Sequence, residues 1–302
     1  MTTERKNVEK DHIVAKLIPE KISECSTVGP NAGACFSEQT LGKIAEKLKI
    51  SAPKHQILEK SKEILGCDSA KCTVDKLSID IGKDVMNFKV HGPIDNTLLS
   101  NYNIDAVMHQ YAARFKDFYP YNFNMLNYMD YSFKNGNVLN EPDSLATIQF
   151  ADLYKSGFRR AGCVINTDVY QGNGKHWMAL FVDSAGPTVE FFNSSGNSPA
   201  PEWISYLVKT RDQLNNCTGK QAQIIKVTTI RQQQSKTECG VYSLFYIWAR
   251  LNGVSYKYFM DVKVPDQLMF EFRQHIFEGS PYENMSFDFE EYAEKFPLKW
   301  EK

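Results

Sequence analysis

Four side chains that lie far apart in the sequence could together perform nucleophilic catalysis. Cys239 carries a thiol, His176 an imidazole, and Asn193 and Gln233 side-chain amides. Catalysis by a thiol needs a thiolate, a histidine as acid–base partner, a group that orients the histidine, and donors for an oxyanion. The chain contains each residue type, so the fold must bring them together.

Cys239 stands at the start of an apolar run. Residues 241–249 carry no charge, and this short length predicts a buried helix, because a membrane span needs about 20 apolar residues. The unpaired N–H groups and the dipole of a helix N-terminus favour an anion, and they can lower a thiol pKa to about 3.5–7.5. Cys239 could equally be a small buried apolar residue, so its partners must decide.

His176 and Asn193 lie at the open end of a predicted β-hairpin. Residues 176–183 and 188–193 are β-rich runs joined by a four-residue Gly/Pro link. If the residues flanking this link face each other, Asn193 becomes a diagonal neighbour of His176 on the same face, about 7–8 Å away. A shift of the register by one residue would destroy this relationship.

The oxyanion donor is ambiguous in the sequence. Gln232, Gln233 and Gln234 are adjacent in the loop before Cys239, and spacing alone does not choose among them. Each candidate residue also has an ordinary structural role open to it, such as a strand-end histidine or a solvated loop glutamine.

Composition favours a soluble globular protein with free thiols. The chain has 302 residues, 42% apolar and 24% charged, and a net charge of −1, so no basic field predicts binding to nucleic acid or an anionic membrane. The N-terminus has no signal-peptide pattern, and we predict no membrane insertion. Seven cysteines, an odd number, predict a reducing compartment with free thiols rather than a disulfide framework.

No pattern predicts a metal or a cofactor. Cys67 and Cys72 could form half of a zinc site, but no second pair with suitable spacing follows, which favours two ordinary thiols. The Gly-rich turn before His176 lacks the Ser or Thr that a phosphate-binding P-loop requires.

Three segments are expected along the chain. Residues 1–91 are lysine-rich and poor in aromatics, and they predict a small helical unit, with one helix capped by Ser37 and another from Pro53 to Leu65. Residues 92–277 form the core. Residues 278–302 form an acidic tail with seven carboxylates and three lysines.

Helical and strand-like patterns are interspersed within the core, which predicts an α+β fold. Besides the hairpin, the expected elements are an apolar helix face from Ile104 to Phe118, strands at 161–168 and 223–230, and helices at 201–215, 239–251 and 266–277. The helix at 201–215 is expected to bury Trp203, Ile204, Leu207, Val208 and Leu214.

Several motifs carry a family resemblance. The stretches GKHW (174–177), FFNSSGNSP (191–199) and TECG (237–240) resemble active-site motifs of the SUMO protease-like cysteine peptidases, which include the adenovirus protease. The chain is more similar still to the polyprotein-processing proteases of African swine fever virus and its giant-virus relatives. Similar stretches span most of residues 65–277.

The resemblance implies a catalytic order of His, Asn or Asp, Gln and Cys, carried by His176, Asn193, Gln233 and Cys239. It selects Gln233, because the family glutamine stands six residues before the nucleophile. SUMO proteases usually have aspartate at the position of Asn193, whereas the asfarvirus-type enzymes have asparagine. The implied fold is a SUMO protease-like core with a central mixed sheet and a helical N-terminal arm.

The resemblance also implies a substrate. Trp177 matches the tryptophan that narrows the channel for small residues before the cut, and Asn166 is a further substrate-binding or supporting candidate. The implied reaction is cleavage after Gly-Gly in a viral structural polyprotein by a late protein during virion maturation, in the host cytoplasm (the viral factory) and the virion. Gly-Gly peptides are then the partners expected, and nucleic acid is not.

Other functions remain open. A deubiquitinase or SUMO-removing isopeptidase acting on host conjugates would use the same four residues, and an effector-type acetyltransferase reuses a similar His–acid–Cys order. A non-enzymatic binding module is disfavoured, because none of the four positions is missing.

Overall fold

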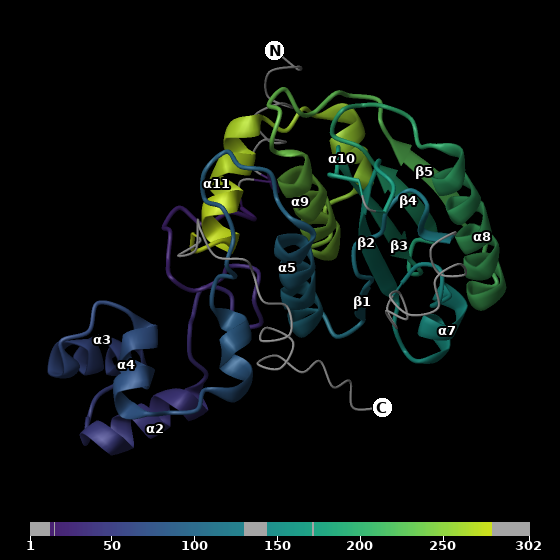
Figure 1. Cartoon of the computed structure of the whole chain (residues 1–302). Helices are drawn as coiled ribbons and strands as arrows, with labels where there is room; N and C mark the ends of the chain where they lie inside the picture. Colours follow the sequence, from purple (N-terminus) through teal and green to yellow (C-terminus); the bar gives the residue numbers. More distant parts are fainter. Residues whose placement is uncertain (1–12, 15, 130–143, 171, 280–302) are drawn as a thin grey trace, which may run out of the picture.

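A five-stranded mixed sheet forms the centre of the computed structural model, which describes residues 13–14, 16–129, 144–170 and 172–279 (Figure 1). Its strands follow chain order, and the central pairs β2–β3 and β3–β4 are antiparallel whereas the outer pairs β1–β2 and β4–β5 are parallel. The strands are β1 (Phe118–Pro120), β2 (Arg160–Asn166), β3 (Trp177–Asp183), β4 (Thr188–Phe192) and β5 (Gln223–Val227). This mixed sheet, interspersed with helices, confirms the predicted α+β fold.

The β3–β4 hairpin has the register that the sequence predicts. Asp183 pairs with Thr188 across the link, and Ala179 pairs with Phe192 farther along. All five residues of β4 are buried, so a one-residue slip would exchange the two buried faces of the strand. The prediction of the hairpin is confirmed.

Helices cover both faces of the sheet. On one face lie α5 (Asn101–Arg114) and α9 (Cys239–Leu251), with α11 (Asp266–Ile276) packed beyond α9. On the other face lie α7 (Phe150–Lys155) and α8 (Pro201–Thr218) (Figure 1). Every residue of α9 except Arg250 is buried, as its uncharged sequence predicts.

Two helical predictions are wrong in part. The helix predicted through Phe118 ends at Arg114, and Phe118 instead begins β1. Ile204 and Val208 are each 38% exposed, because the sheet covers only the stripe of α8 that carries Trp203, Leu207 and Leu214. Apolar periodicity identified the helix but overestimated the width of its buried face.

The N-terminal helices have a small hydrophobic cluster of their own. They are α2 (Glu38–Leu48), α3 (Lys54–Leu65), α4 (Ala70–Leu77) and the 3₁₀ helix η1 (Gly82–Asn87). Ser37 caps α2 and Gly66 ends α3, as the sequence predicts. Ile44, Ile57 and Phe88 belong to the cluster. The boundary after residue 91 remains a prediction.

Other segments join this helical unit to the core. Val14, Ile18 and Val28 pack in the core cluster that contains α9. Glu278 accepts hydrogen bonds from Lys71 of α4 at 2.8 Å. Apart from Glu278 and Gly279, the predicted acidic tail lies outside the described residues.

The prediction of free thiols is wrong for four of the seven cysteines. Disulfides join Cys25 to Cys35 and Cys67 to Cys72, with Cα–Cα distances of 4.9 and 5.7 Å, both within the usual range for a bridge. All four lie before the core, where local folding brings each pair together. The free cysteines are Cys163, Cys217 and Cys239.

Candidate active site

The hairpin register places His176 beside Asn193. His176 immediately precedes β3, and Asn193 immediately follows β4. Their side chains meet at 2.7 Å between Nε2 of the imidazole and Oδ1 of the amide. The structure therefore brings together two of the four predicted catalytic residues in direct contact.

The hydrogen bonds around Asn193 determine which histidine nitrogen carries a proton. Asn193 Oδ1 accepts from the backbone N–H of Ser195 at 3.0 Å and from its hydroxyl at 2.8 Å, and Nδ2 donates to the carbonyl of Asn197 at 3.0 Å. A backbone N–H only donates and a carbonyl only accepts, so the amide has one consistent orientation. His176 Nε2 must then donate, which leaves Nδ1 of the neutral ring as a base.

Cys239 is the first residue of α9 and lies beside the start of β3. The backbone N–H of Trp177, the residue after His176, is close enough to the Cys239 thiol to lower the pKa of that thiol. A Cβ atom added at Gly240 would lie 3.1 Å from Leu99 Cδ1 and 3.2 Å from Trp177 Cδ1. The absence of a side chain at Gly240 therefore allows the nucleophile's helix to approach the strand that follows His176.

Burial has the largest effect on the pKa of the Cys239 thiol. Burial raises its pKa, and the nearby charge of Glu238 acts in the same direction, whereas backbone hydrogen bonds from Trp177, Gly240 and Cys239 itself oppose the rise in pKa. The expectation of a pKa lowered by the helix N-terminus is wrong here, because burial outweighs the helix end. A base is therefore needed to remove the thiol proton, and His176 directly precedes β3, whose first residue packs against Gly240.

The structure separates the three adjacent glutamines. Both ends of the Gln232 amide bond backbone groups in and after α10 (Tyr256–Asp261), so its side chain holds the chain together. The Gln234 side chain is exposed. Only Gln233 combines burial with an amide directed along the loop that enters Cys239.

Gln233 is fixed by two polar partners. Its Oε1 accepts from the hydroxyl of Ser194 at 2.8 Å, and its Nε2 donates to the backbone carbonyl of Ser235 at 2.9 Å. The backbone N–H of Gln233 also donates to the Ser194 carbonyl at 2.9 Å. These bonds join the loop before Cys239 to the segment that follows Asn193, so both amides are anchored in one short segment of chain.

Trp177 and Asn166 occupy different positions around the site. Trp177 Nε1 donates to the Leu99 carbonyl at 3.1 Å, which holds the indole against Gly240. Asn166 is buried at the end of β2, where its Oδ1 accepts from the backbone N–H groups of Asp168 and Lys175 at 2.9 and 3.1 Å. The Asn166 side chain thus braces the loop that leads into His176.

Sequence reasoning missed a buried ion pair next to Cys239. Glu238 and Arg273 have fully buried side chains, and their charged groups lie 2.8 Å apart at the closest approach. A lone arginine between the apolar residues Phe272 and Ile276 of a predicted helix was the available signal. Ser194 was also missed, although it directly follows Asn193.

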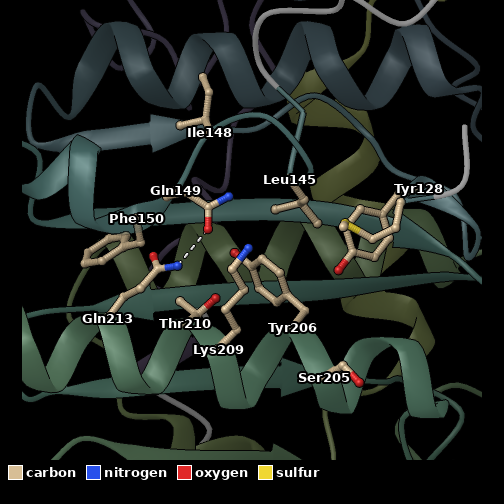
Figure 2. A pocket seen from close by; sticks show the side chains of 11 residues that line it. Tyr128, Leu145, Ile148, Gln149, Phe150, Ser205, Tyr206, Lys209, Thr210 and Gln213 are labelled. Atoms are coloured by element: carbon tan, nitrogen blue, oxygen red, sulfur yellow. Dashed lines mark hydrogen bonds between the residues drawn. The ribbon is translucent and has the colours of Figure 1, made fainter. Parts of the chain in front are cut away.

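The pocket in Figure 2 is separate from these residues. It has a volume of about 140 Å³ and lies between α8 and the residues 128–129 and 145–150, on the face of the sheet opposite α9. Gln149 and Gln213 hydrogen-bond at 2.8 Å along its wall. Within the described ranges, no cluster of His, Cys, Asp and Glu could hold a metal ion.

Comparison with known proteins decides the family. Residues 164–282 match the Ulp1 protease family, C-terminal catalytic domain. The cysteine protease S273R of African swine fever virus (strain Badajoz 1971 Vero-adapted) is 35% identical over 284 residues, which cover 87% of this chain and 98% of the relative. The chain belongs to the family of the S273R cysteine proteases.

Solved structures agree with this membership in the S273R-type cysteine proteases. The crystal structure of the African swine fever virus pS273R protease matches with a TM-score of 0.67 and 31% identity, covering 88% of this chain and 99% of that one. R355 of Acanthamoeba polyphaga mimivirus, named as a thiol protease, is 25% identical over 69% of this chain and 70% of its own length. The protein is a cysteine-type peptidase with a SUMO protease-like fold.

The sequence predicts no membrane insertion. Among the described helices, none combines the length and apolarity that a membrane span requires.

Proposed function

We propose that this protease cleaves a viral structural polyprotein after Gly-Gly during virion maturation, in the host cytoplasm and the virion. The observation that carries the proposal is the close packing of Trp177 and Leu99 against Gly240, the residue that follows Cys239. A substrate residue beside the sulfur must share this crowded region with Leu99 and the indole. Glycine residues before the cut need the least room, which supports the Gly-Gly preference.

The first half of the proposed reaction forms a thioester. His176 Nδ1 takes the proton from Cys239 Sγ, and the thiolate attacks the carbonyl carbon of the second glycine. The Cys239 backbone N–H and Gln233 Nε2 donate to the oxyanion that forms. The C–N bond then breaks, and His176 returns the proton to the leaving amine.

The second half regenerates the enzyme. His176 removes a proton from water, and the resulting hydroxide attacks the thioester carbonyl. The C–S bond breaks, the product leaves with a free carboxylate, and Cys239 recovers its proton from the imidazolium. Asn193 orients the ring in both halves, because its Oδ1 accepts a hydrogen bond from the Nε2–H group.

The test compares matched peptides. A Gly-Gly-Ala peptide and a Val-Val-Ala peptide with the same flanks are incubated with the enzyme, and the new termini are identified by mass spectrometry. We expect cleavage only after Gly-Gly; equal cleavage of both peptides would contradict the specificity. Incubation with the virus's own capsid-associated polyprotein, and immunoblots of purified virions, test the substrate and the location.

Removal of SUMO-like proteins from host conjugates is the second candidate. Relatives 34% identical to this chain, from two African swine fever virus isolates, carry the name SUMO-1 cysteine protease. Isopeptide-linked SUMO and the viral polyprotein can be assayed in parallel at equal concentrations. Faster turnover of the isopeptide would favour this second function over polyprotein processing.

A further inference from the structure

Ser194 links the segment that carries Asn193 to the loop that carries Gln233. It is fully buried directly after Asn193, and it bonds Gln233 twice, through its hydroxyl at 2.8 Å and its backbone carbonyl at 2.9 Å. Gln233 lies 39 residues farther along the chain. The segment that follows β4 is therefore hydrogen-bonded to the loop that leads into α9.

The Ser235 carbonyl allows only one orientation of the Gln233 amide, and the Ser194 hydroxyl anchors the amide oxygen in that orientation. In that orientation Oε1 accepts from Ser194, and one N–H of Nε2 donates to the Ser235 carbonyl. A flipped amide would place its oxygen against the Ser235 carbonyl oxygen, where two acceptors repel. Within the described part of the chain, the second N–H of Nε2 meets no protein acceptor, so it remains available to a ligand.

We propose that Ser194 is a positioning residue that holds the Gln233 amide with its free N–H directed for oxyanion binding. The inference rests on the proposed function, in which Gln233 donates to the oxyanion. Ser195 makes the equivalent bond to the other amide, because its hydroxyl donates to Asn193 Oδ1 at 2.8 Å. Two consecutive serines thus orient the two amides of the site.

Replacement of Ser194 by alanine removes the donor to Gln233 Oε1 while leaving the backbone contact. The amide then rotates, and the oxyanion loses a fixed donor. Complete loss of such a donor lowers kcat about 10²–10³-fold, so we expect S194A to lower kcat at least tenfold on a Gly-Gly peptide. KM should stay within twofold, because the hydroxyl acts in the transition state and not on bound substrate.

A double-mutant cycle tests whether Ser194 acts through Gln233. In the Q233A background the amide is absent, so the further change S194A should alter kcat by less than twofold. Wild-type kcat in S194A would overturn the proposal. An equal loss from S194A in both backgrounds would overturn it as well, since the effect would then be independent of Gln233.

A matched control separates the positioning role of Ser194 from the general effect of losing a buried hydrogen bond. Ser61 of α3 is also fully buried, and its hydroxyl donates to the Leu58 carbonyl at 2.6 Å, within the N-terminal helical unit. We expect S61A to lower the midpoint of urea unfolding as much as S194A does, with kcat unchanged. A fall in kcat for S61A equal to that for S194A would overturn the positioning role.

A measurement without substrate separates this inference from the proposed function. In ¹⁵N-glutamine-labelled protein, the Gln233 side-chain amide signals are those that Q233A removes. We expect hydrogen exchange of these protons to be at least tenfold faster in S194A than in wild type, and equal rates would overturn the proposal. Wild-type protein that leaves the Gly-Gly peptide intact would refute the proposed function, whereas the exchange rates still decide the role of Ser194.

Discussion

The Glu238 carboxylate forms two hydrogen bonds with the Arg273 guanidinium, at 2.8 and 3.2 Å, directly before Cys239. Arg273 also donates to the Pro93 carbonyl at 3.0 Å. The first turn of α9 is therefore tied to α11 and to the chain that enters the core. A second buried pair, Glu190 with Arg250, holds the other end of α9.

Replacement of Glu238 by glutamine should destabilise the protein and make the thiol more acidic. Arg273 would keep its charge without a buried partner, which typically costs about 3–5 kcal/mol and is measurable by urea denaturation. The Glu238 charge raises the Cys239 pKa, so its removal should shift the pH dependence of Cys239 alkylation to lower pH.

The variant E190Q is the matched control for this prediction. E190Q breaks the second buried pair, so it should lose comparable stability. That pair holds the end of α9 that is far from Cys239. Alkylation of Cys239 in E190Q should keep the wild-type pH dependence. Identical profiles for E238Q and E190Q would show that Glu238 does not influence the thiol.

Replacement of Asn193 separates the orientation of His176 from hairpin stability. N193A removes the acceptor for Nε2, so kcat/KM should fall about 10²-fold, the lower range for acid–base catalysis. N193D keeps an acceptor for His176 and for both donors of Ser195, so it should retain more activity than N193A. Steady-state rates in which N193D is no better than N193A would contradict the orienting role.

The close approach at Gly240 should not tolerate a methyl group. G240A would force Leu99 or Trp177 to move by a few tenths of an ångström, and we expect kcat/KM to fall about tenfold. Gly42 in α2 provides the control, because a Cβ there meets nothing within 4 Å. G42A should keep full activity and gain about 0.5–1 kcal/mol; a loss of activity equal to that of G240A would contradict the assignment.

The two disulfides should be detectable by thiol counting. Alkylation of unfolded, unreduced protein should label Cys163, Cys217 and Cys239, and prior reduction should expose all seven cysteines. Loss of the Cys25–Cys35 bridge in a C25S/C35S variant should lower the unfolding free energy by about 2–4 kcal/mol. Labelling of seven cysteines without reduction would contradict the bridges.

The sequence predicted those parts of the candidate site whose geometry depends on local sequence pattern. A four-residue link and the alternation of β-rich runs set the pairing of Asp183 with Thr188, which in turn brings Asn193 to His176. The uncharged run after Cys239 predicted its buried helix. Both features depend on residues that are close in sequence or on one strand pair.

Features that depend on distant packing were not predictable. Spacing did not distinguish the three glutamines, because the hydroxyl that fixes Gln233 comes from Ser194 on another element. Arg273 and Glu238 are 35 residues apart, and neither shows its partner in the sequence. Cysteine parity likewise gave no information about the local folding that brings Cys25 to Cys35.

The most direct test of the central claim is covalent labelling of the nucleophile. A Gly-Gly peptide whose C-terminal carboxylate is replaced by a vinyl sulfone, which adds a thiolate across its double bond, is incubated with native protein, and the modified residue is located by mass spectrometry. We predict one adduct, on Cys239, in the wild type and none in H176A over the same time. An adduct on Cys163 or Cys217 instead, or undiminished labelling of Cys239 in H176A, would contradict a thiol that His176 activates.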